Sequence, residues 1–144
     1  MKIFLDSSAL AQRYIDEPCS QIVEEIFLTT PEIGISVLCP VEIISALNRR
    51  LREGRIPRQP YRKIRSKLFE DCDSMEMISL EQEIISGAIS LLERHILRAS
   101  DALHIASARI WICDLFVSAD QRQCNAAELS GLTVRYLSPG KPIK

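Results

Sequence analysis

Residues 3–10 read IFLDSSAL, and this stretch decides how the rest of the chain is interpreted. The apolar run 3–5 predicts a short buried strand, and the serines and apolar residues after it predict the start of a helix. Asp6 therefore stands where a strand is followed by a helix. Its carboxylate, like the hydroxyl of Ser7 or Ser8, could cap that helix. It could equally bind a ligand or a metal, because these collect at strand ends in α/β folds.

The composition is that of an ordinary globular protein, with 47% hydrophobic and 26% charged residues. We expect residues 1–144 to form a single domain, with 138–144, which contain two prolines and a glycine, as a loose tail. A formal net charge of −1 excludes a global field that attracts nucleic acid.

The five scattered cysteines favour reduced thiols over a disulfide framework or a zinc site. We identify no signal peptide or membrane-spanning run and so predict a cytoplasmic protein without membrane contact.

Strand and helix patterns alternate along the chain. Apolar and β-branched runs predict strands at residues 2–6, 32–37, 75–80, 115–120 and 133–137. Helical spacing of apolar residues predicts helices at residues 7–15, 19–30, 40–54, 61–72, 81–95, 100–111 and 124–131. No tight hairpin turn such as Asn-Gly separates the strands. The sequence therefore predicts an α/β fold, with a mostly parallel sheet of about five strands between two layers of helices.

Four acids stand at strand ends or near helix starts. The strand 115–120, LFVSAD, ends in Asp120 just as the first strand leads into Asp6. Glu42 lies in CPVEIISAL and Asp101 in RASDALHIASA, each early in a predicted helix. Each acid alone is explained by helix capping or by a favourable interaction with the helix dipole. In a parallel sheet, however, all four would come to the same edge.

Carboxylates crowded at one edge repel each other unless a positive charge neutralises them. A hard divalent cation such as Mg²⁺ or Mn²⁺ does so, with oxygen ligands from one or two carboxylates and several waters. Such a cation polarises a phosphoryl oxygen and activates an attacking water. The residue set is therefore typical of metal-assisted phosphodiester hydrolysis. His104 is assigned to packing, because this chemistry needs no histidine.

The motifs IFLDSSAL, VEIISAL, RASDALHIASA and FVSAD, in this order and spacing, resemble those of a PIN domain. The likeness is strongest to the VapC-type toxins of prokaryotic toxin–antitoxin pairs, and it covers essentially the whole chain. It implies a three-layer α/β/α nuclease with strand order 3-2-1-4-5. An RNA substrate, a cognate antitoxin and a homodimer are implied as well.

The same resemblance implies roles for individual residues. Asp6 and Asp101 would be the most direct ligands of Mg²⁺ or Mn²⁺. Asp120 and Glu42 would complete the catalytic site, directly or through water. Ser118 would orient a carboxylate or a water molecule.

The segment 49–67 carries half of the positive charge of the chain. It contains nine of the 18 Lys and Arg residues, against a single acid, Glu53. One interpretation is a solvated helix pair, and the other is a surface for nucleic acid or a partner, since phosphate contacts give sequence-independent affinity. We predict the second, with the candidate residues Arg49, Arg50, Arg62, Lys63 and Arg65. Few aromatic residues lie nearby, which favours recognition of a structured RNA over base stacking.

Other functions share part of this pattern. Aspartyl-phosphate chemistry of the haloacid dehalogenase type needs a second aspartate where this chain has Ser8. A receiver-type phosphoacceptor needs a lysine that FVSADQRQ lacks. A non-catalytic binding module with the same fold stays open, and so does a housekeeping nuclease rather than a toxin. The acids Asp71 and Asp73 are assigned to a surface turn.

Overall fold

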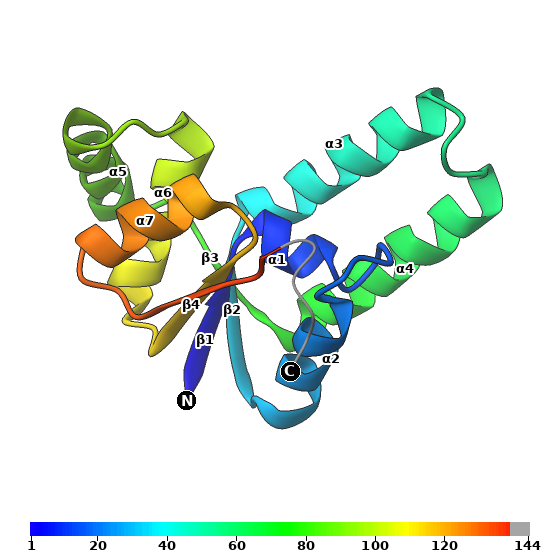
Figure 1. The fold of residues 1–144 in the computed structure, drawn as a ribbon, viewed down its shortest axis with the longest axis horizontal. Coiled ribbons are helices and arrows are strands. Elements are labelled where there is room, and N and C mark those ends of the chain that lie inside the picture. Colours follow the sequence, from blue (N-terminus) through cyan, green and yellow to red (C-terminus); the bar gives the residue numbers. More distant parts are fainter. Residues whose placement is uncertain (139–144) are drawn as a thin grey trace.

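The fold is a parallel sheet between two layers of helices (Figure 1). A computed structural model describes residues 1–138. In this range one sheet is formed by five strands: β1 (Lys2–Leu5), β2 (Glu32–Ser36), β3 (Glu76–Ile78), β4 (Leu115–Ser118) and β5 (Val134–Tyr136). The strand order is β3-β2-β1-β4-β5, and neighbouring strands are parallel throughout. The predicted three-layer fold and strand order are confirmed.

The helices divide between the two faces of the sheet. Within residues 1–138 they are α1 (Ser7–Ala11), α2 (Ser20–Thr29), α3 (Leu38–Arg52), α4 (Arg58–Ser74), α5 (Gln82–Arg94), α6 (Ala99–Trp111) and α7 (Gln121–Leu129). Residues of α1 to α4 share a core with Leu5, Ile35 and Val117 on one face. Residues of α5, α6 and α7 pack around Phe4 and Phe116 on the other. In Figure 1, α3 and α4 form a hairpin that extends away from the sheet.

The alternation of side chains along β1 explains the two layers. Ile3 and Leu5 belong to the core under α1 to α4. Phe4 points to the opposite face, where its ring stacks on Phe116 with 5.7 Å between the ring centroids. β1 is the central strand and pairs with β2 and β4. The carboxyl ends of β1 and β4 are therefore neighbours, which brings the residues after Leu5 and Ser118 together.

Gly34 in β2 allows a close approach of α6 to the sheet. A Cβ at this position would lie 2.7 Å from the ring of Trp111, a distance that real side chains do not reach. A larger residue would push the ring away. The same ring donates through Nε1 to Glu76 at 2.9 Å. The end of α6 is thus held against β2 and β3.

Element boundaries differ from the prediction by a few residues. The strands are shorter than predicted, and the first helix ends at Ala11. α4 begins at Arg58, so Pro60 lies in its first turn rather than in the break before it. A proline is tolerated there because its missing N–H has no helical partner to lose. Of the predicted tail 138–144, residues 139–144 lie outside the described residues.

The assignment of Asp71 to a surface turn is wrong. Asp71 lies in α4, is 8% exposed, and pairs with Arg13, whose Nε donates to Oδ2 at 2.8 Å. The arginine and the aspartate are far apart in the chain, so no local pattern marks the pair.

In residues 1–138, no helix combines the length and the apolar character needed to cross a bilayer.

Candidate active site

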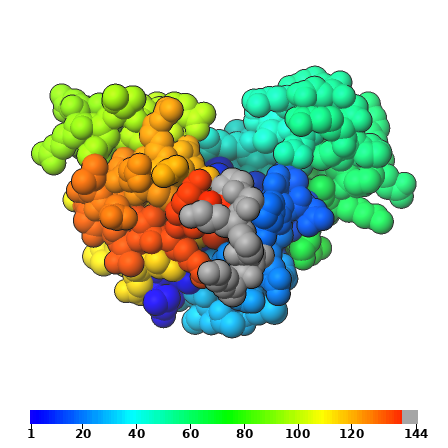
Figure 2. Space-filling model, in the orientation of Figure 1, coloured from blue at the N-terminus to red at the C-terminus, as the bar shows by residue number. Residues whose placement is uncertain are grey.

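Four acidic side chains line one cavity at the carboxyl edge of the sheet. They are the four that the sequence analysis selected: Asp6, Glu42, Asp101 and Asp120. The cavity has a volume of about 240 Å³, and its walls come from α1, α3, α6 and the start of α7. Figure 2 shows the surface notched between the α3–α4 hairpin and the side formed by α5 and α6. The fold thus gathers acids that are spread over most of the sequence.

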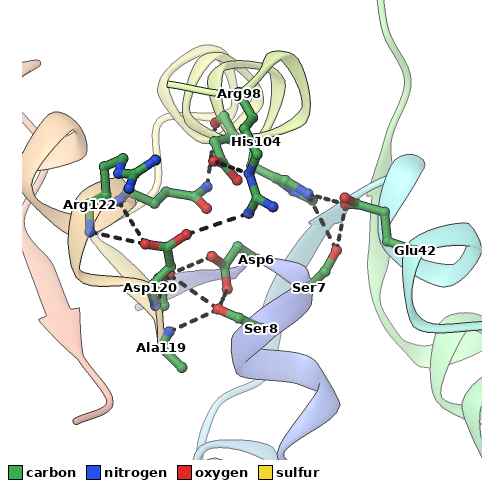
Figure 3. Close-up of polar contacts among 12 residues, drawn as sticks. Asp6, Ser7, Ser8, Glu42, Arg98, His104, Ala119, Asp120 and Arg122 are labelled. Atoms are coloured by element: carbon green, nitrogen blue, oxygen red, sulfur yellow. Dashed lines mark hydrogen bonds and ion pairs between the residues drawn. The ribbon is translucent and has the colours of Figure 1, made fainter. Parts of the chain in front are cut away.

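Asp6 is both a helix cap and a pocket acid. As the N-cap of α1 it accepts a hydrogen bond from the Ala9 N–H at 2.9 Å. It is 2% exposed. Ser8 donates to Oδ1 at 2.7 Å (Figure 3), and Ser118 at the end of β4 donates to Oδ2. Burial raises the pKa of Asp6, and the electrostatic interaction with His104 and these hydrogen bonds offset only part of that rise.

Asp6 and Asp101 meet at the side chain of Gln123 in α7. In the amide orientation that satisfies its hydrogen bonds, the Gln123 nitrogen donates to Asp101 Oδ1 at 3.1 Å and to Asp6 Oδ2 at 2.9 Å. All three residues are buried. One donor atom therefore reaches both carboxylates, whose oxygens converge on the same point of the pocket.

A cation from the chain itself covers the outer side of the pocket. Asp120 caps α7, where its Oδ1 accepts from the N–H groups of Arg122 at 3.0 Å and Gln123 at 3.4 Å. The other oxygen of Asp120 lies 3.7 Å from Arg98 Nη2. Arg98 Nε also donates to Asp101 Oδ2 at 3.2 Å. The contacts with Asp101 and then Asp120 raise the pKa of Arg98, which stays charged.

Glu42 lies on α3, at the other end of the pocket. Its Oε1 accepts from Ser7 Oγ at 2.8 Å and lies 2.6 Å from His104 Nε2 (Figure 3). Burial alone would raise the pKa of Glu42, but the hydrogen bonds from His104 and Ser7 outweigh it and lower the pKa. His104 is 2% exposed and meets the ring of Phe4 edge-on. It is packed in the core, as predicted, and it also holds Glu42, a contact that was not predicted.

The donors in the pocket fit a hard divalent cation held by two carboxylates. Asp6 and Asp101 present oxygens to the same point, and Mg²⁺ commonly takes one or two carboxylates and completes its shell with water. In the part of the chain that the structure describes, no group of three or more His, Cys, Asp or Glu side chains is arranged to hold a metal. Gln123 contacts Asp6 and Asp101, and Arg98 contacts Asp101 and Asp120, so a cation bound to these carboxylates competes with both side chains. The roles of the four acids as ligands stay a prediction.

Several contacts of the pocket acids were not assigned from the sequence. They come from Ser7, Ser8, Arg98, His104 and Gln123. Three of these lie one helical turn from a predicted acid: Arg98 precedes Asp101 by three residues, His104 follows it by three, and Gln123 follows Asp120 by three. This spacing could have found the contact of Arg98 with Asp101, whereas the side chains of His104 and Gln123 contact acids on other elements.

The predicted basic residues lie apart from the pocket. Arg49 and Arg50 are near the end of α3, and Arg62, Lys63 and Arg65 are on α4. None of these five described residues lines the acidic cavity. Arg62 and Lys63 line a separate surface hollow of about 640 Å³ along α4. The hairpin therefore carries a basic surface of its own, and its role in binding stays a prediction.

The chain matches a known family over most of its length. A family model described as PIN domain matches residues 3–129. No curated protein matches the chain in sequence.

Solved structures share the fold at low sequence identity. VapC20 of Mycobacterium tuberculosis, described as a toxin that cleaves the sarcin–ricin loop, is 16% identical with a TM-score of 0.70, and the match covers 92% of this chain and 97% of that one. VapBC2 of Rickettsia felis, bound to a DNA fragment from its promoter, is 14% identical with a TM-score of 0.70, and the match covers 96% and 100%. DNA-bound VapBC of Salmonella typhimurium is 13% identical with a TM-score of 0.71, and the match covers 94% and 98%. At these identities the likeness establishes the fold alone.

Proposed function

The chain belongs to the PIN domain family, and on this basis we propose that it is a Mg²⁺- or Mn²⁺-dependent endoribonuclease acting on structured RNA. We propose further that it is the toxin of a VapBC-type toxin–antitoxin pair. One observation carries the enzymatic proposal: the buried carboxylates of Asp6 and Asp101 meet at one point of a cavity that Glu42 and Asp120 complete. Buried acids gathered in a cleft, one of them with a pKa raised by burial as for Asp6, are typical of functional sites.

Three acids of the pocket have distinct roles in this proposal. Asp6 and Asp101 hold the cation, and Ser8 and Ser118 orient Asp6 by donating to both of its oxygens. Such a cation, when bound, polarises a phosphoryl oxygen and activates a water. Glu42, whose pKa is lowered, stays ionised on the opposite wall and is suited to orient a water.

The proposal includes an RNA substrate and a protein partner. The basic surface of the α3–α4 hairpin offsets the repulsion between the acidic pocket and a polyanion. Structural neighbours that are toxin–antitoxin complexes support an antitoxin partner. The homodimer and the cytoplasmic location belong to the same proposal, by resemblance.

The first test is cleavage of a panel of structured RNAs, a sarcin–ricin hairpin among them, by purified antitoxin-free protein with Mg²⁺ or Mn²⁺. We expect cleavage that a chelator abolishes and that Asp6→Asn lowers by at least about 100-fold, because it removes a metal ligand. Asp73→Asn, an equal change of charge at an exposed position of α4, is the matched control and should cleave like wild type.

Equal cleavage by wild type and Asp6→Asn would trace the activity to a contaminant and contradict the proposal. No cleavage together with no metal binding would favour the non-catalytic binding module. Growth arrest on expression, relieved by a neighbouring gene product, would distinguish a toxin from a housekeeping nuclease.

RNA binding by the hairpin is tested by changing Arg62, Lys63 and Arg65 together to Gln. We expect weaker RNA binding and a salt dependence whose logarithmic slope falls by about two, because up to three phosphate contacts are lost. The control changes Arg94, Arg109 and Arg135 to Gln, which removes the same charge from exposed positions outside the hairpin. Unchanged affinity in the first variant would contradict the assignment.

A further inference from the structure

Arg98 covers the acidic pocket with a positive charge. Within residues 1–138 it is the one Lys or Arg side chain that forms ion pairs with pocket acids, at 3.2 Å from Asp101 and 3.7 Å from Asp120. Its own side chain is 72% exposed, whereas that of Asp101 is 7% exposed. An exposed guanidinium thus pairs with a buried carboxylate.

Helix stability does not explain an arginine at this position. Arg98 is the N-cap of α6 and makes no side-chain capping hydrogen bond. The dipole at a helix N-terminus favours negative rather than positive side chains. Because the Arg98 side chain is largely exposed, solvent weakens its ion pair with Asp101 and allows the guanidinium to take another partner. The position of Arg98 is therefore better explained by the pocket than by the fold.

Arg98 also lines a second hollow next to the acidic cavity. This hollow has a volume of about 640 Å³, and its other walls come from Asp120, Gln121, Arg122 and Asn125. It combines two arginines and two side-chain amides with a single acid, whereas the inner cavity contains four acids. Because the side chain of Arg98 borders both spaces, rotation about its exposed stem would move the guanidinium between them without moving α6.

We propose that, in the metal-free protein, Arg98 pairs with the Asp101 carboxylate for which the divalent cation competes. When the cation takes Asp101, the guanidinium moves to the outer hollow and binds a phosphate oxygen of the RNA together with Arg122. This inference rests on the proposed function, and it names a residue that positions the substrate. A guanidinium suits the exchange because it is always charged and its fork of donors matches carboxylates and phosphates alike.

The test measures metal binding and RNA cleavage separately. Mn²⁺ is titrated by calorimetry into metal-free protein without RNA, for wild type, Arg98→Gln, Arg98→Lys and Arg122→Gln. We expect Arg98→Gln to bind Mn²⁺ about three- to tenfold more tightly, because a competing charge close to the ligands is gone. Arg122→Gln removes a charge that forms no ion pair with a pocket acid, so its affinity should change less than about twofold.

RNA cleavage at saturating Mn²⁺ gives the second readout. We expect Arg98→Gln and Arg122→Gln each to raise KM for RNA by about tenfold, because each loses a charge-assisted contact with phosphate. Arg98→Lys keeps the charge, so its Mn²⁺ affinity should stay near wild type, and its KM should rise less than that of Arg98→Gln. Arg98→Gln would therefore bind metal better and RNA worse, which a merely structural residue would not do.

Unchanged or weaker Mn²⁺ binding by Arg98→Gln would overturn the inference, and the proposed function would stand if wild type still cleaves RNA. Tighter Mn²⁺ binding with an unchanged KM would overturn the phosphate contact. Absence of both Mn²⁺ binding and cleavage in wild type would overturn the proposed function and, with it, this inference.

Discussion

Asp6 and Asp71 are two buried aspartates with opposite surroundings. Asp71 accepts from Arg13 Nε at 2.8 Å and Nη2 at 3.3 Å, and from the Tyr14 hydroxyl at 2.7 Å. Asp6 accepts from hydroxyl, backbone and amide donors. Burial raises the pKa of both carboxyls. The contacts with Arg13 and Tyr14 reverse that effect for Asp71, whose pKa is lowered, whereas the pKa of Asp6 is raised.

The difference separates a carboxylate that holds the fold from one that is available to a ligand. Arg13 also pairs with Glu24 at 2.8 Å and lies over the ring of Phe27 at 3.9 Å, so the network of Asp71 joins α2, α4 and the turn after α1. Asp6 has no fixed cation of this kind within residues 1–138. A buried charge without a fixed partner is costly to folding and is best explained by what it binds.

The largest expected effect on stability comes from Asp71→Ala. It should lower the free energy of unfolding by about 3 kcal/mol, because Arg13, whose side chain is 10% exposed, keeps only Glu24 as a partner. Urea denaturation measures the change. Asp73→Ala on the same helix is the control and should cost less than about 0.5 kcal/mol. A similar loss in both variants would remove the distinction between the two aspartates.

Asp6→Asn should act in the opposite direction in protein kept free of metal. We expect the free energy of unfolding to rise by up to about 1 kcal/mol, because a neutral amide avoids the burial of an unpaired charge. Asparagine also caps a helix as well as aspartate does. Urea denaturation in the presence of a chelator checks this. A clear loss of stability would mean that the charge of Asp6 is needed for the fold.

The smallest effects are the slopes of stability with pH. The pKa of Asp71 lies below its ordinary value of 3.8 in the folded state. Its contribution to stability is therefore present above pH 3.8 and is lost as the pH falls through the lowered pKa. The pKa of Asp6 lies above 3.8 in the folded state. Its cost to stability is therefore absent below pH 3.8 and grows as the pH rises toward and through the raised pKa. Both variants are measured in chelator-treated protein, as the free energy of unfolding against pH. Asp71→Ala should flatten the part of this curve below pH 3.8, and Asp6→Asn should flatten the part above it. Curves parallel to wild type would contradict both assignments.

The sequence by itself determined the elements, their class and the edge at which the acids gather. Hydrophobic periodicity is a local property, so the strand before Asp6 and the strand before Asp120 could be predicted without any tertiary contact. The alternation of strands and helices then required a parallel sheet with both Asp6 and Asp120 at its carboxyl edge. The strand order itself came from the family resemblance of the motifs, because many orders satisfy the same alternation.

Only the tertiary structure decided which partner each acid has. Asp71 and Asp73 look alike in the sequence, yet packing of α4 buries the first against Arg13 and leaves the second exposed. In the pocket, Gln123 joins Asp6 to Asp101, and Arg98 covers the opening. These contacts depend on how helices pack over the sheet, and burial and charge compensation are therefore set by residues far apart in the chain.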